Sequence, residues 1–351
     1  MHDEIPPSTV PENVKLSLLN FPDEQEFIQV FIKDMKEAII DCGRFLDLER
    51  LDGVTVGYDF GAALESVDLG YESTVATQYT NNGDVIAVAK AMNVLRDGIV
   101  MSHVVYNGNI IAPLVDSSHE HHLDALHIIS HEFGHVAELK WRDEAMPGLM
   151  LKRSEGDWAE NMLLQTAIVA WEEYAACRMT GMVGDREALK QRYSQEFDKS
   201  AGHSLQRAEQ KIKEYRTHGD VGKLLVEAGE PISMPFKMAG YMMGHLDAIE
   251  DSTPLEELCP LYAKTHLTTF IPKLFAALRT IWDERELGKG VAIFAPLSAL
   301  LEEAYLAAGI ELIPQGEGRG YYINVPFTAA TMPNGEADMV IINLRKQLGL
   351  D

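Results

Sequence analysis

The chain has few cysteines, few basic residues and no long hydrophobic run. Its three cysteines, Cys42, Cys177 and Cys259, are too few and too widely spaced for a disulfide framework or a CxxC metal knuckle. Lysine and arginine number 30 against 54 aspartates and glutamates, which gives a formal net charge of −24. Because nucleic acids and anionic membrane surfaces repel negative charge, this acidity disfavours both as partners.

No apolar run reaches the ~18 residues of a membrane span, and the N-terminus lacks the apolar segment of a secretory signal. We therefore expect no membrane partner and a reducing cytoplasmic compartment. With 351 residues, of which 46% are hydrophobic, the chain can bury a sizeable core in one large domain or two moderate ones. Its oligomeric state does not follow from the sequence.

The pattern of segments predicts an α+β fold in three parts. Residues 1–22, rich in proline and acidic residues, are expected to form a loose N-terminal arm. Residues 23–150 are predicted to form an α/β lobe that ends in a long helix. Residues 151–351 are predicted to form a mainly helical lobe with short C-terminal strands.

Hydrophobic periodicity places the individual elements. Helices are predicted over residues 24–48, 119–140, 157–180, 186–218, 238–247, 261–284 and 296–308. Strands are predicted over residues 54–60, 99–106, 110–115, 321–327 and 339–344, while residues 84–95 are ambiguous. Asn107-Gly108, between two predicted strands, is a hairpin signal.

The segment His131-Glu132-Phe133-Gly134-His135 has the form H-E-x-x-H. Residues four apart on a helix project from the same side, so both imidazoles can bind one metal ion. The glutamate then lies where it can meet a metal-bound water. The motif therefore predicts a Zn²⁺ site with His131 and His135 as ligands and Glu132 as general base.

The predicted helix around this motif has two unlike sides. Its polar stripe consists of Asp124, His127, His131, His135 and Glu138. Its apolar side consists of Leu126, Ile129, Phe133 and Val136. We expect the apolar side to pack in the core and the histidine-rich stripe to face a cleft, with Ser117 or Ser118 as the helix N-cap.

A catalytic zinc commonly takes three protein ligands and leaves one position for water. The extended motif H-E-x-x-H-x-x-G-x-x-H fails, because Glu138 and Trp141 stand where Gly and His are required. A later predicted helix offers Glu172 and Glu173. Glu173 falls among apolar positions, where an acid needs a partner, and is the predicted third ligand; Glu172 is the alternative.

The HEFGH motif followed by Glu173-x-x-Ala176 resembles the gluzincin branch of the zincin-like metallopeptidases over about residues 98–180. A weaker likeness is to the cytoplasmic regulator-cleaving metallopeptidases of the ImmA/IrrE type. The resemblance implies a small twisted sheet whose edge strand lies over the active-site helix, followed by the helix with the third ligand. Cys177 departs from the family pattern, which has an aspartate there that orients a histidine ligand.

The resemblance implies a peptidase that cleaves a peptide or protein substrate by metal-activated water. The substrate strand is expected to pair with an exposed sheet edge, either residues 99–106 or residues 110–115. Tyr241 and His245, four residues apart, are candidate donors to the developing oxyanion, and His127 is another.

Two further interpretations remain open. The chain could be a zinc amidase or deacylase that acts on a small molecule, which a closed, deep pocket would favour. It could also be a metal-binding regulatory protein with a vestigial site, an interpretation that the cysteine at position 177 supports.

Overall fold

A computed structural model describes residues 5–72, 88–151, 157–316 and 320–350. The chain divides into two compact units. The first comprises residues 1–153, 172–190 and 243–251, and the second comprises residues 154–171, 191–242 and 252–351. The fold is α+β, as predicted, with a small mixed sheet in the first unit and mainly helices in the second.

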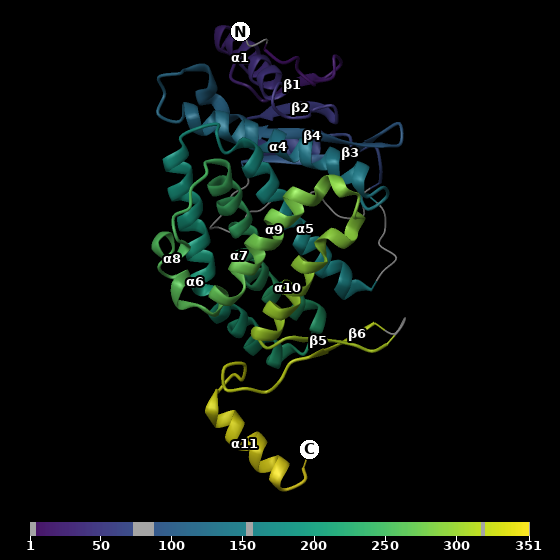
Figure 1. The fold of residues 1–351 in the computed structure, drawn as a ribbon, viewed down its shortest axis with the longest axis vertical. Helices are drawn as coiled ribbons and strands as arrows, with labels where there is room; N and C mark the ends of the chain where they lie inside the picture. The colour runs from purple at the N-terminus through teal and green to yellow at the C-terminus, as the bar shows by residue number, and fades with distance from the viewer. Residues whose placement is uncertain (1–4, 73–87, 152–156, 317–319, 351) are drawn as a thin grey trace. The chain divides into compact units, whose positions relative to one another are not determined.

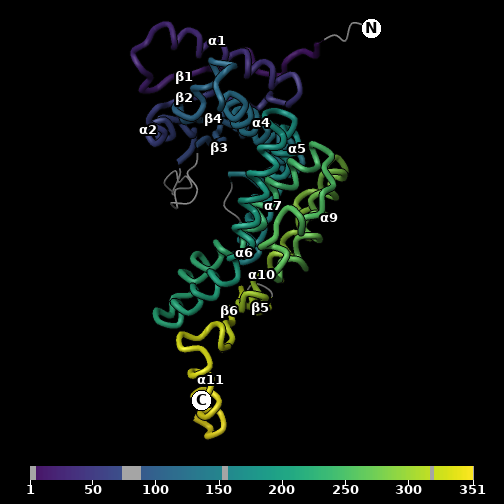
Figure 2. The backbone as a smooth tube through the Cα atoms, turned by 90° about the vertical axis from the view of Figure 1, so that its left-hand side faces the viewer, coloured from purple at the N-terminus to yellow at the C-terminus, as the bar shows by residue number. Residues whose placement is uncertain are grey.

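The sheet of the first unit has the strand order β1-β2-β4-β3 (Figures 1 and 2). Its strands are β1 (Lys15–Leu19), β2 (Leu51–Gly57), β3 (Ala89–Arg96) and β4 (Ile99–Asn107). The pairs β1–β2 and β2–β4 are parallel, whereas β3 runs antiparallel to β4. The N-terminal segment expected to be a loose arm thus supplies an edge strand.

Helices α1 (Gln25–Cys42) and α4 (His122–Ala145) share one hydrophobic core with this sheet. Val54, Val104 and Phe133 are fully buried in it. The hydroxyl of Tyr106 donates a hydrogen bond of 2.9 Å to the carbonyl of Ile129, which ties β4 to α4. The metal-motif helix is therefore fixed against the sheet. The short helix α2 (Phe60–Glu65) belongs to a second cluster that includes Met92 and Val105.

One strand prediction next to the motif helix is wrong. Residues 110–115 lie in helix α3 (Gly108–Ile111) and the 3-10 helix η1 (Ala112–Val115), so Asn107-Gly108 makes no hairpin. The side chain of Asn107 accepts the backbone N–H of Asn109 and caps α3 instead. The strand predicted over residues 99–106 is confirmed as β4, but its expected position at a sheet edge is wrong, because β4 lies between β2 and β3.

The second unit contains most of three long helices, α5 (Trp158–Thr180), α6 (Arg186–His218) and α7 (Val221–Ala248). Its shorter elements are α8 (Leu255–Leu258), η2 (Tyr262–Lys264), η3 (His266–Thr269), α9 (Ile271–Glu284), η4 (Arg285–Leu287), η5 (Gly290–Phe294) and α10 (Ala295–Ala307). The antiparallel strands β5 (Glu311–Pro314) and β6 (Tyr321–Asn324) and helix α11 (Glu336–Gln347) follow. The strand predicted over residues 339–344 is wrong, since these residues lie in α11.

One segment, Gly290–Ala307, is long and apolar enough by composition to cross a membrane. The segment is only partly buried: Leu297 and Leu301 in it are each 1% exposed, whereas Leu306 is 55% exposed. Since the core helices of soluble proteins meet the same criterion, this one segment is weak evidence for a membrane span.

Candidate metal centre

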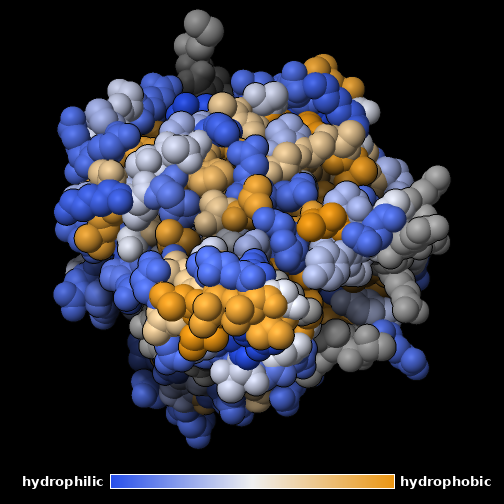
Figure 3. All heavy atoms as spheres, turned by 90° about the horizontal axis from the view of Figure 1, so that it is seen from below, coloured by the Kyte–Doolittle hydropathy of each residue, from blue (hydrophilic) through white to orange (hydrophobic). Residues whose placement is uncertain are grey.

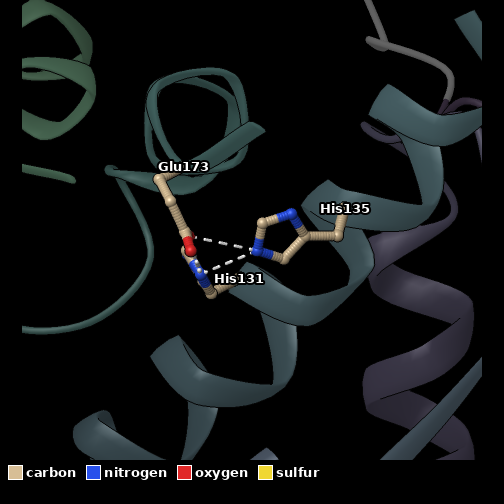
Figure 4. Close-up of side chains that lie close together, drawn as sticks. All are labelled: His131, His135 and Glu173. Atoms are coloured by element: carbon tan, nitrogen blue, oxygen red, sulfur yellow. Dashed lines mark hydrogen bonds and ion pairs between the residues drawn. The ribbon is translucent and has the colours of Figure 1, made fainter. Parts of the chain in front are cut away.

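Three side chains from two helices meet in the first unit: His131 and His135 of α4, and Glu173 of α5 (Figure 4). The Nε2 atoms of the two histidines are 3.2 Å apart. The Oε2 atom of Glu173 lies 3.4 Å from Nε2 of His131 and 3.3 Å from Nε2 of His135. The three predicted ligands thus direct three possible ligand atoms to one point.

These distances fit a small divalent cation. Zinc–ligand bonds of about 2.0–2.1 Å at tetrahedral angles place neighbouring ligand atoms roughly 3.3 Å apart. A single shared proton can bridge only two of the three atoms, whereas a cation between them interacts with all three. His131 and Glu173 are each 7% exposed, so the group could hold a metal ion in a buried setting.

The electrostatics of the site also favour a positive charge. Burial of the His135 ring acts to lower its pKa, but the hydrogen bond to Glu173 and the negative charges of Glu173, Glu132 and Glu172 outweigh burial. The result is a pKa of about 9. The surroundings therefore stabilise a cation at the position where the three ligand atoms meet.

A close approach of two helices brings Glu173 to the histidines. A Cβ atom on Gly134 would lie 2.9 Å from Cα and 3.1 Å from Cβ of Ala176. Gly134 is inside the motif, and Ala176 lies one turn beyond Glu173 on α5. The small residues at these two positions therefore let α4 and α5 pack closely enough for the carboxylate to reach both imidazoles.

Glu172 and Glu173, the two candidates for third ligand, have different partners. Glu172 accepts a hydrogen bond from Nη2 of Arg142. The Arg142 Nε also donates to Oε1 of Glu138 at 2.9 Å, and Nη2 donates to Oε2 of Glu138 at 3.1 Å. The guanidinium is thus held between Glu138 and Glu172, and Glu173 is the carboxylate that points to the histidines.

Cys177 contacts the ring of the predicted ligand His131. Its Sγ atom is 3.6 Å from Nδ1 of His131, the ring nitrogen that faces away from the three-atom group. A histidine that binds metal through Nε2 carries its proton on Nδ1 and donates it to a neighbouring acceptor, which fixes the tautomer and the ring orientation. Cys177 therefore contacts Nδ1 of His131, the atom to which a hydrogen-bond partner that orients this ring must bind.

The polar stripe of α4 is more buried than its pattern predicted. His127 and Glu138 are each 3% exposed, although a stripe facing a cleft was expected. Nδ1 of His127 lies 3.0 Å from the carbonyl oxygen of Val183. The predicted N-cap is also wrong, because the cap is His121 and no side-chain hydrogen bond accompanies it. Sequence periodicity predicts that these residues share one face of the helix. It does not predict which other segments of the same chain cover that face.

Glu132 and the two predicted oxyanion donors are placed as follows. Glu132 is half-buried, and its charge acts on His135. His245 is fully buried in the first unit, with Nε2 at 2.9 Å from the carbonyl oxygen of Arg186, and burial lowers the pKa of this ring. Tyr241 belongs to the second unit, where its ring stacks on Tyr193. The donor role of His245 and Tyr241 stays a prediction.

Sequence analysis did not assign a role to Arg142 or to the contact between Gly134 and Ala176. Arg142 lies seven residues after His135, on the turn beyond Glu138, and an arginine four residues after a glutamate signals an ion pair on a helix. Its second partner, Glu172, is distant in sequence and follows only from the packing of α5.

No family model, curated protein or solved structure matches this chain, so the candidate centre rests on its own geometry.

Replacing Gly134 with alanine tests the helix contact. The new methyl group must push α4 and α5 apart, at a cost of about 1–3 kcal/mol of overpacking, and draw Glu173 away from the histidines. We expect weaker zinc binding in a competition titration with a chromophoric chelator. Gly61→Ala is the matched control, because its Cβ meets only Oδ1 of Asp59, at 3.5 Å. Equal zinc affinity in the two variants would contradict the role of the contact.

Replacing Cys177 tests the partner of His131. Cys177→Ala removes the acceptor for Nδ1–H and is expected to lower zinc affinity on the order of 10-fold, as loss of such partners commonly does. Cys177→Ser keeps a polar atom at the position and should retain more of the affinity. The same zinc dissociation constant for the alanine variant and the unaltered protein would show that the thiol does not orient the ring.

Proposed function

We propose that this chain is a zinc-dependent metallopeptidase of the cytoplasm with a zincin-like fold. The observation that carries the proposal is the triangle of ligand atoms from His131, His135 and Glu173, with Glu132 following directly after the first ligand. A three-residue ligand set is typical of catalytic zinc, whereas structural zinc is normally closed by four protein ligands. The H-E-x-x-H motif and the placement of Glu173 support the gluzincin resemblance.

Each residue has a distinct part in the proposed reaction. His131, His135 and Glu173 would hold the zinc, which when bound supplies Lewis-acid polarisation of a carbonyl and lowers the pKa of water toward ~7. The carboxylate of Glu132 accepts the proton of the attacking water and later returns it to the leaving amine. Cys177 holds the His131 ring through Nδ1, and Arg142 holds the carboxylate of Glu172 by a hydrogen bond.

The edge strand β3 is the proposed pairing site for an extended substrate. The outer side of β3 is already occupied near its C-terminal end, because the N–H of Leu95 donates to the carbonyl of Leu69, at 2.8 Å, and the hydroxyl of Tyr71 donates to the carbonyl of Asn93, at 3.3 Å. Alternate residues of an antiparallel strand direct their backbone polar groups to the same side, so those of Ala89 and Ala91 also point away from β4. The side chains of Ala89 and Ala91 pack on the core shared with α4, which supports β3 as the place where a peptide adds to the sheet.

A zinc amidase or deacylase that acts on a small molecule is the second candidate. The low exposure of His131 and Glu173 favours it, because a confined metal centre suits a compact amide. Incubation with a denatured-protein mixture and with a panel of small acyl amides, each with and without chelator, distinguishes the two. Chelator-sensitive cleavage of the proteins supports the peptidase, and turnover of the small amides alone overturns it.

Glu132→Gln tests the general base. The amide cannot take a proton from water, so we expect zinc content to stay at the level of the unaltered protein while peptide hydrolysis falls by at least about 100-fold. Metal analysis and cleavage of a fluorogenic peptide library measure the two quantities. Turnover that survives in a zinc-loaded variant would rule out Glu132 as the base.

Glu173→Gln and Glu172→Gln together test the assignment of the third ligand. The first change replaces the anionic oxygen that faces both imidazoles, and we expect zinc to be lost or bound far more weakly. The second changes the partner of Arg142 and removes a negative charge that acts on His135, but it removes no predicted ligand atom, so bound zinc should remain. Zinc stoichiometry measured by mass spectrometry of the native proteins gives the answer. The reverse pattern would assign the site to Glu172.

A further inference from the structure

The C-terminal helix α11 carries a hydrophobic stripe that the described part of the chain leaves exposed. None of the twelve residues of α11 is buried. Val340, Ile341 and Leu344 of α11 are 67%, 59% and 54% exposed, and Leu348, the C-cap residue that follows the helix, is 62% exposed. These positions recur at intervals of three and four residues, so they lie along one side of the helix. Figure 3, which views the molecule from below, shows hydrophobic side chains gathered into a band on that face.

The opposite side of α11 is partly exposed as well, and the helix extends away from the other helices of the second unit (Figures 1 and 2). Met339 and Ile342 are only half-exposed, and at 100° per residue they fall opposite the stripe. Both sides of the helix are therefore accessible, and the stripe is the more exposed of the two. Contiguous apolar surface of this kind on a strongly charged protein marks an interaction site.

The charges on α11 select the partner. The first turn carries Glu336 and Asp338, and the last turn carries Arg345 and Lys346. Two acids and two bases leave the helix locally balanced, although the whole chain has a formal net charge of −24. Two copies of the chain repel each other elsewhere, but they can approach at this helix without repulsion.

The order of these charges also fixes the orientation of a pair. In an antiparallel pair with a two-fold axis near the middle of the stripe, Ile341 of one copy faces Leu344 of the other. Asp338 and Arg345 lie on the same flank of the stripe, at 100° per residue, and each also bonds within the chain: Asp338 accepts from Asn334, and Arg345 donates to the carbonyl of Leu350. The two-fold axis then places Arg345 of each copy beside Asp338 of the other, and the opposed helix dipoles add to the attraction.

We propose that the exposed stripe of α11 is a self-association surface on which two copies of this chain pair their C-terminal helices in antiparallel orientation. The partner is a second copy, because the surface is self-complementary in both its apolar side chains and its charges. A pair of twelve-residue helices buries less area than the ~1,200 Å² of a standard interface, so the dimer is weak and depends on concentration.

The first test is the mass of the full-length protein in sedimentation equilibrium over a wide range of concentration. The mass is expected to rise toward twice that of the monomer. Leu344→Glu is expected to abolish this rise, whereas Asn343→Glu, beside the stripe, is expected to keep it. Circular dichroism of each variant verifies that the fold is intact. A protein that stays monomeric throughout, or a dimer that Leu344→Glu leaves unchanged, overturns the proposal.

The second test reverses the charges. Asp338→Lys and Arg345→Glu each place like charges opposite one another across the pair, so each alone is expected to reduce dimerisation by about tenfold or more. The double variant Asp338→Lys/Arg345→Glu restores opposite charges, and its dimerisation is expected to recover. A double variant as monomeric as the single ones overturns the antiparallel arrangement. Monomer that instead binds anionic vesicles through the stripe assigns the surface to a membrane and overturns self-association.

Discussion

The candidate centre depends on how closely two helices can approach. Histidines four apart on α4 would share a side in any helix, but a third ligand must come from another element. It comes from α5, and the distance is set where Gly134 meets Ala176. Glu173 lies one turn from Ala176, so the same contact that brings the two backbones together brings a carboxylate to the imidazoles. The packing of α4 against α5 and the geometry of the three ligand atoms therefore depend on the same contact.

The buried charges around this contact are arranged in two groups. Arg142 lies between Glu138 and Glu172, and one guanidinium neutralises part of the charge of both acids. Glu173 faces His131 and His135. Because a buried carboxylate is costly unless it is paired, the second group gains most from a cation that binds all three side chains. Metal binding would therefore contribute to the stability of the first unit as well as to its chemistry.

The success of the sequence predictions varied with the kind of signal. The long helix over residues 186–218 was predicted with its exact bounds, because a continuous periodic pattern ends at Gly219, which has a φ of +69°. Residues 339–344 were predicted as a strand and are part of α11, since a short apolar run does not distinguish helix from strand. Residues 110–115 failed because the side chain of Asn107 caps a helix rather than turning a hairpin.

The sequence by itself determined the donor types and their spacing on one helix, the burial of Glu173 and the acidity of the chain. These are local or compositional properties that 3.6-residue periodicity and residue chemistry express directly. Only the tertiary structure decided that Glu173 and not Glu172 meets the histidines, that Cys177 contacts His131, and that β3 is a sheet edge. Each of these depends on contacts between residues far apart in the chain. Tertiary packing sets the geometry of these contacts, and no single segment of the sequence determines it.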